Sequence, residues 1–195
     1  VALDWMMLEQ VCAFFGAHRE LDGCAVSVNF SARQFLAPDA ERRVLDTLER
    51  HGLAPARLKL ELTERVLAGD IRRVRAVMEA LAARGVEFYL DDFGTGYSNL
   101  SSVVSLPLQY VKVDRSLLEA ATNGGGGTLL LRAVVETFRA MGRGILLEGV
   151  ETPEQYALAC TLRADRLQGY YLARPMPGEE LCALMRSGAR RTRRT

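Results

Sequence analysis

Two adjacent carboxylates, Asp91 and Asp92, are the residues of the sequence best placed to do chemistry. A short apolar run, 88–90, precedes them, and the glycine-containing turn 94–96 follows them directly. This order predicts a buried strand with charge at its carboxyl end, where the backbone is free to bend around a ligand. We therefore expect the other polar residues of a functional site to converge on this point.

Polar residues also lie near the ends of the other predicted strands. Together with the acidic pair they are Asn29, Glu61, Asp91, Asp92, Lys112, Glu148 and Gln168. Taken alone, each acid would more often cap a helix or pair with an arginine. Several carboxylates and an asparagine on neighbouring strands would repel one another and titrate upward, and a divalent cation would offset that repulsion.

The ligand types indicate which cation. The strand ends offer oxygen atoms, and they include neither histidine nor cysteine, so they favour Mg²⁺ or Mn²⁺ over Zn²⁺. Two such ions bridged by an acid are a standard arrangement for the hydrolysis of a phosphodiester.

The elements that must position these residues alternate between strands and helices. Apolar residues at helical spacing occupy 3–15, 40–51, 71–84, 129–141, 153–162 and 178–185, and strand-like runs occupy 25–30, 58–62, 88–92, 108–114, 145–148 and 164–168. This alternation predicts an α/β chain with parallel strands and crossover helices. Polar residues at nearly every strand end favour a TIM-like (β/α) barrel over a doubly wound sheet. With about six of the eight strand–helix units, we expect the barrel to be incomplete.

Length and charge set the remaining limits. We expect one domain over 1–187, followed by a basic tail at 188–195 that could touch anions but is more simply a solvated, disordered end. The net charge of +1 gives no general attraction to nucleic acid or to anionic membranes. No apolar run approaches the roughly 20 residues that a membrane span needs, which predicts that this stretch of chain is soluble. We expect a cytoplasmic domain, and the full-length protein could be membrane-anchored.

Cysteines and glycines give weaker signals. The cysteines at 12, 24, 160 and 182 form no paired or metal-binding spacing, so we expect reduced and mostly buried thiols. The four glycines at 124–127 predict a mobile loop.

Six segments of the chain resemble, in order and spacing, the EAL-domain phosphodiesterases of bacterial cyclic di-GMP signalling. The segments are 28–35, 60–64, 91–98, 111–116, 148–152 and 168–171. The resemblance extends over residues 1–185, and six ordered motifs are far more specific than one glycine-rich turn.

The resemblance implies that cyclic di-GMP is opened to linear pGpG with two Mg²⁺ or Mn²⁺ ions, and that Ca²⁺ is inhibitory. It implies metal ligands at Asn29, Glu61, Asp91, Asp92 and Glu148. Glu148 would otherwise serve as the general base. Lys112 would orient the attacking water or stabilise the negative charge that develops on the phosphate.

Supporting roles are also implied by the resemblance. Glu151 would assist Glu148, and Gln168 would position substrate or water. Glu64 would steady the loop that follows Asp92, and through this loop the family forms homodimers. A GGDEF or sensory domain upstream is a further expectation at the level of the family.

One departure from the family keeps alternatives open. The sequence contains no Glu-Ala-Leu motif before Asn29, so we expect the first family strands, with one metal ligand, to lie upstream of Val1. The loss of a ligand would weaken metal binding. The alternatives are therefore a catalytically impaired domain that binds cyclic di-GMP or a protein partner without turnover, and a partial chain with no activity of its own.

Overall fold

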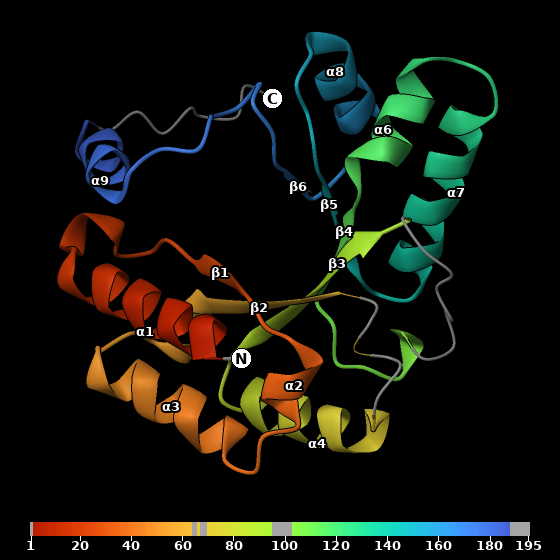
Figure 1. Cartoon of the computed structure of the whole chain (residues 1–195). Coiled ribbons are helices and arrows are strands. Elements are labelled where there is room, and N and C mark those ends of the chain that lie inside the picture. The colour runs from red at the N-terminus through yellow and green to blue at the C-terminus, as the bar shows by residue number, and fades with distance from the viewer. Residues whose placement is uncertain (1, 64–65, 67–69, 95–102, 188–195) are drawn as a thin grey trace.

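Six parallel strands form a curled sheet, with helices around its outer side (Figure 1). The computed structural model describes residues 2–63, 66, 70–94 and 103–187. The strands are β1 (Val26–Asn29), β2 (Leu58–Thr63), β3 (Glu87–Phe93), β4 (Tyr110–Val113), β5 (Gly144–Leu147) and β6 (Arg166–Leu167). They lie in chain order, and each pairs in parallel with the next. The predicted incomplete (β/α) barrel is therefore confirmed.

The helices follow the strands in the predicted alternation. They are α1 (Ala2–Ala17), α2 (Ala32–Phe35), α3 (Ala40–Arg50), α4 (Ile71–Ala82), α6 (Arg115–Thr122), α7 (Gly127–Ala140), α8 (Pro153–Thr161) and α9 (Gly178–Arg186), with short 3₁₀ turns η1 (Arg19–Leu21) and η2 (Pro55–Arg57). Among the described residues, no helix is long and apolar enough to cross a membrane.

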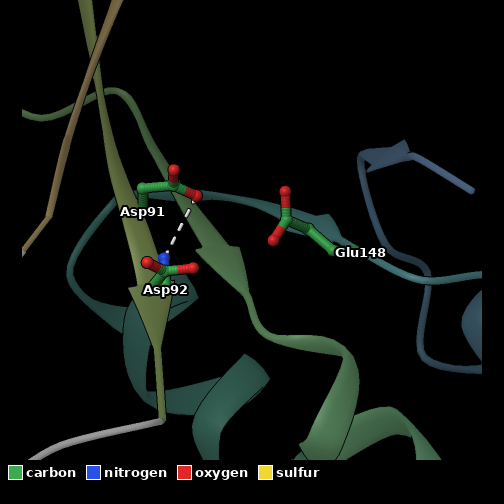
Figure 2. A group of neighbouring side chains, drawn as sticks. All are labelled: Asp91, Asp92 and Glu148. Atoms are coloured by element: carbon green, nitrogen blue, oxygen red, sulfur yellow. Dashed lines mark hydrogen bonds between the residues drawn. The ribbon is translucent and has the colours of Figure 1, made fainter. Parts of the chain in front are cut away.

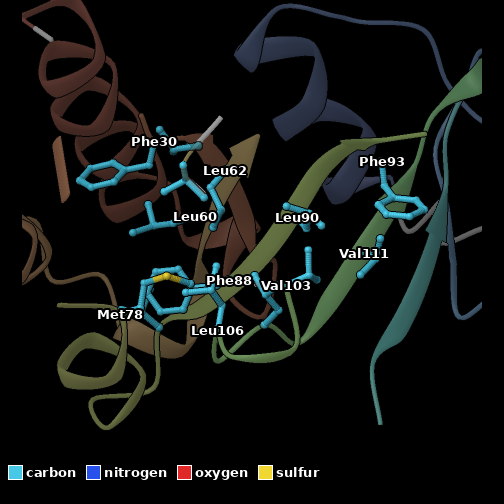
Figure 3. Packing of buried hydrophobic residues seen from close by; sticks show 14 of the residues in the cluster. Phe30, Leu60, Leu62, Met78, Phe88, Leu90, Phe93, Val103, Leu106 and Val111 are labelled. Carbon is cyan, nitrogen blue, oxygen red and sulfur yellow. The ribbon is translucent and has the colours of Figure 1, made fainter. Parts of the chain in front are cut away.

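The hydrophobic core lies between the outer face of the sheet and these helices. Leu60, Leu90 and Val111 alternate with inward-facing residues along their strands and are fully buried. Figure 3 shows how Phe88 and Leu106 extend this packing toward Met78 of α4. Because the apolar residues are used on the outer face, the inner face of the curled sheet can carry polar residues.

Two local predictions need correction. Gly127 is not part of a mobile loop, because it is the first residue of α7; a side chain there would come within 2.2 Å of the Ala120 carbonyl oxygen on α6. The close approach of the two helices therefore requires a glycine. The cysteines are free as expected, but only Cys12 and Cys182 are buried, and Cys160 is exposed.

Candidate active site

The predicted site residues lie where parallel strands end side by side. The register pairs Asn29 of β1 with Glu61 of β2, and Thr63 of β2 with Asp91 of β3. Glu148 follows β5 directly, and its backbone N–H donates to the Val113 carbonyl at the end of β4. The common direction of the strands therefore gathers residues that are more than 80 positions apart in the sequence onto one edge of the sheet.

Lys112 lies at the centre of the site. Its Nζ is 2.8 Å from Glu61 Oε2, 2.7 Å from Asp91 Oδ1 and 2.8 Å from Glu148 Oε1. The lysine side chain is only 5% exposed, and its three partners come from β2, β3 and the end of β5. One buried ammonium group thus ties together carboxylates from three strands.

This arrangement shifts two pKa values. Burial alone would lower the pKa of Lys112, but hydrogen bonds to Asp91, Glu148 and Glu61 outweigh burial and raise it above its usual range. For Glu148, burial raises the pKa, and the charges of Asp91 and Glu61 act in the same direction, while Lys112 opposes them. Lys112 therefore stays charged, and Glu148 accepts a proton more readily than an ordinary glutamate does.

An irregularity in β3 brings Asp92 into the site. Successive residues of a regular strand point to opposite faces, which would turn Asp92 away from Asp91. The β3–β4 register instead shifts between Leu90 and Phe93, and Asp92 adopts a positive φ of 57°. The Asp92 backbone N–H donates to Asp91 Oδ1 at 3.1 Å, and both carboxylates lie near Glu148 (Figure 2).

The cluster of Asp91, Asp92 and Glu148 fits a divalent cation. One carboxylate oxygen from each residue lies within 4.8 Å of the other two. Three carboxylates share the Lys112 ammonium group and Asp92 adds a fourth beside them, so this group of residues has an excess of negative charge. An all-oxygen set of acids suits Mg²⁺, Mn²⁺ or Ca²⁺.

The other predicted residues are less closely engaged. Asn29 is exposed beside Glu61, and Gln168 is exposed at the end of β6. The Glu151 carboxylate accepts a hydrogen bond from Arg115 at 2.7 Å, and its backbone N–H donates to the Gln155 side chain that caps α8. Glu64 and the loop after Gly94, at 95–102, lie outside the described residues, so loop support and dimer contacts stay predictions.

Sequence reasoning missed a second set of polar residues on the inner face. Lys59, Glu87, Tyr89 and Arg166 are connected beneath the acidic cluster, toward the amino ends of the strands. The signal was available, because Lys59, Tyr89 and Arg166 each stand two positions before a predicted site residue. In a strand, that spacing puts both residues on the same face.

Comparison with known proteins gives consistent matches. The family model described as "EAL domain" matches residues 1–175. MucR of Pseudomonas aeruginosa, named a bifunctional diguanylate cyclase/cyclic di-GMP phosphodiesterase, is 37% identical over 158 residues, which is 81% of this chain and 23% of MucR. Across the curated relatives, the chain spans 20% to 29% of their length.

Solved structures agree with the sequence matches. The PaMucR phosphodiesterase in complex with c-di-GMP superposes with a TM-score of 0.83 at 34% identity, covering 93% of this chain and 74% of that one. Klebsiella pneumoniae BlrP1, in a complex with manganese and cy-diGMP, gives a TM-score of 0.78 at 27% identity over 87% of this chain and 43% of BlrP1.

Proposed function

The chain belongs to the EAL domain family, a phosphodiesterase family of cyclic di-GMP signalling, and on this premise we propose that it hydrolyses cyclic di-GMP to linear pGpG with two divalent cations. The observation that carries the proposal is the convergence of Glu61, Asp91 and Glu148 on Lys112, with Asp92 brought alongside. An excess of acids around one ammonium is costly for a fold, and binding cations for an anionic substrate would offset that cost.

The cation ligands would come from the ends of several strands. Asp91, Asp92 and Glu148 would hold cations, with Glu61 and Asn29 completing the set from β2 and β1. Mg²⁺ or Mn²⁺ bound there would neutralise the phosphodiester and polarise it toward attack by water. We expect Ca²⁺ to occupy the same oxygens without supporting turnover.

Two residues have properties that suit the chemistry. Lys112 carries a fixed positive charge, so it can stabilise a phosphate that gains negative charge but cannot act as a base. If Glu148 does not ligate a cation, its raised pKa makes this carboxylate the better proton acceptor, which suits a general base for the attacking water. Gln168, exposed at the end of β6, is free of the cluster and would contact substrate or water.

The test is conversion of cyclic di-GMP to pGpG by the chain in Mg²⁺ or Mn²⁺, followed by chromatography. We expect turnover by the wild type and a loss of at least about 100-fold in kcat for Glu148→Gln, the scale of general-base catalysis. Glu79→Gln, on an exposed i,i+4 ion pair of α4, is the matched control and should keep its activity.

The same experiment decides the alternative. The alternative is a domain that binds cyclic di-GMP without turnover. Cyclic di-GMP that binds in Ca²⁺, and is not hydrolysed in Mg²⁺ or Mn²⁺, would establish a binding domain and contradict the proposed hydrolysis.

A further inference from the structure

A chain of polar contacts crosses the inner face of the sheet beneath the acidic cluster. Lys59 Nζ lies 2.8 Å from Glu87 Oε2, and the Tyr89 hydroxyl donates to the same Glu87 oxygen at 3.2 Å. Arg166 Nη1 donates in turn to the Tyr89 hydroxyl. Tyr89 is only 1% exposed, so a buried phenol joins a carboxylate on its own strand to a guanidinium on a distant one.

The contact between Arg166 and Tyr89 joins strands that are not neighbours. Tyr89 lies on β3 and Arg166 on β6, with β4 and β5 between them. The guanidinium carbon of Arg166 lies 4.1 Å from the ring centroid of Tyr110 on β4, and the Tyr89 and Tyr110 rings are 4.9 Å apart. The residue of β5 that pairs with Tyr110 is Gly144, and a side chain at Gly144 would come within 2.4 Å of the Tyr110 ring.

The strand that carries Arg166 is short, and backbone hydrogen bonds at its two ends continue its pairing with the neighbouring segment. The Asp165 N–H donates to the Ile145 carbonyl, and the Gln168 N–H donates to the Leu147 carbonyl. β6 has two residues, and its register with β5 consists of Leu146 opposite Arg166 and Leu147 opposite Leu167. These backbone bonds hold β6 against β5 alone, whereas the Arg166 side chain adds a direct contact to β3 and β4.

The register ties this constraint to the acidic cluster above it. Tyr89 stands two residues before Asp91, and Tyr110 stands two before Lys112. Arg166 likewise stands two residues before Gln168. Because the side-chain period of a strand is two, Tyr89, Tyr110 and Arg166 each share a face of the sheet with the residue of the proposed site that follows two positions later.

We propose that Arg166 is a positioning residue, which fixes β6 against β3 through Tyr89 and Tyr110 and thereby holds Gln168 at a set place relative to Asp91 and Lys112. The proposal rests on the proposed function, because it gives Arg166 a role only through the placement of Gln168 toward substrate or water. A shift of about 1 Å in a positioning group can cost about 100-fold in rate.

The test is a double-mutant cycle on kcat/KM for cyclic di-GMP, with Arg166→Met, Gln168→Ala and the double variant. We expect Arg166→Met to lose at least tenfold, and the double variant to be no worse than about twofold below Gln168→Ala alone. The proposal would be overturned if the double variant lost kcat/KM by the product of the two single losses. It would also be overturned if Arg166→Met kept a kcat/KM within twofold of the wild type.

Arg57→Met is the matched control. Arg57 is also a partly buried arginine, which donates to the carbonyls of Cys24 and Leu21 at 2.9 Å each, away from the carboxyl ends of the strands. We expect both Arg→Met variants to lower the melting temperature, and only Arg166→Met to lower kcat/KM. Tyr89→Phe, which keeps the ring and removes the hydroxyl, should reproduce part of the Arg166→Met loss.

The two proposals fail in different ways. A wild-type chain that turns over cyclic di-GMP, with independent effects of Arg166 and Gln168, contradicts only the positioning role. A wild-type chain that binds the dinucleotide in Ca²⁺ without turnover contradicts hydrolysis, and the same cycle run on the dissociation constant then decides the positioning role. A wild-type chain that neither binds nor hydrolyses it overturns both.

Discussion

The inner face of the sheet carries two polar layers that balance their charges differently. In the lower layer, Lys59 pairs with Glu87, and Arg166 lies against the Tyr89 hydroxyl and ring. In the upper layer, Lys112 meets Glu61, Asp91 and Glu148, and Asp92 adds a fourth carboxylate. Lys59 and Lys112 are equally enclosed, with side chains 6% and 5% exposed. Burial alone therefore does not separate the two layers.

The difference lies in what each layer needs from outside the chain. The lower layer pairs one of its two cationic groups, Lys59, with Glu87 and holds the other, Arg166, against tyrosine, so its groups need no added cation and can hold the strands together. The upper layer has more carboxylates than the chain's own ammonium group can compensate, which is typical of sites whose balance is completed by a cation or a substrate. An excess of carboxylates thus marks the proposed site more clearly than the burial of a charge does.

The largest effect is expected from the two lysines. Lys112→Met should lower the free energy of unfolding by roughly 3–5 kcal/mol, because it leaves three buried carboxylates without their partner. Lys59→Met should cost only about 1–2 kcal/mol, because Glu87 is one-third exposed and keeps the Tyr89 hydroxyl as a donor. Urea denaturation of both variants without added metal measures the difference.

Added cation gives the internal control for the lysine pair. Mn²⁺ should restore part of the stability of Lys112→Met, because a cation that binds the folded state shifts the unfolding equilibrium. It should raise the midpoint of Lys59→Met no more than that of the wild type. Equal losses for the two lysines, or equal gains with Mn²⁺, would remove the distinction between the layers.

A smaller effect, opposite in sign in the two layers, is expected from amide substitutions of their glutamates. Glu148→Gln should raise the free energy of unfolding at pH 7 by roughly 0.5–2 kcal/mol while abolishing activity, as is common at functional sites. Glu87→Gln should lower it by about 1–3 kcal/mol, because the buried Lys59 ammonium loses its carboxylate.

The pH dependence of the Glu148 effect follows from its raised pKa. A carboxyl group with a higher pKa in the folded state binds protons more tightly there, so its ionised form opposes folding at pH values above the folded-state pKa. The gain from Glu148→Gln should therefore fade as the pH falls, and vanish below the ordinary glutamate pKa of about 4.3. A gain that grows toward acidic pH would contradict this assignment.

The sequence predicted the upper layer better than the lower one, for a physical reason. Charged residues after an apolar run stand out at strand ends, so Glu61, Asp91 and Glu148 could be found without coordinates. The spacing of Tyr89 and Arg166 indicates the face on which they lie, but their contact depends on the curvature of a sheet that brings β3 and β6 together. Curvature is set by the packing of the whole sheet and leaves no local pattern.

Prediction from sequence was limited in the same way for single helices and for the backbone conformation of single residues. The alternation of strands and helices was predictable because hydrophobic periodicity is a local signal. Helix α6 was missed, because it spans only eight residues and follows β4 with no intervening loop. The left-handed conformation of Asp92 was also beyond sequence reasoning, because aspartate does not by itself require a positive φ.

The smallest expected effect is on the stability of glycine and alanine variants, because the backbone conformation of β3 differs between the two layers. The Tyr89 region of β3 follows regular strand geometry, whereas Asp92 departs from it with a φ of 57°. At position 92, a glycine variant should be more stable than an alanine variant by about 1 kcal/mol, since only glycine adopts this conformation without steric cost. At position 91, which keeps its regular pairing with Thr63 of β2, alanine should be more stable than glycine by roughly 0.5–1 kcal/mol.

Comparison of the four variants isolates the backbone from the charge. Each pair lacks the same carboxylate, so loss of charge and of metal binding cancels within the pair, and only the backbone preference remains. Urea midpoints that change order between positions 91 and 92 would show that the irregularity of β3 is a strained feature. Alanine above glycine at both positions would instead mean that the strand is regular through Asp92. The acidic pair would then be divided between opposite faces of the sheet, and Asp92 would have to be removed from the proposed metal ligands.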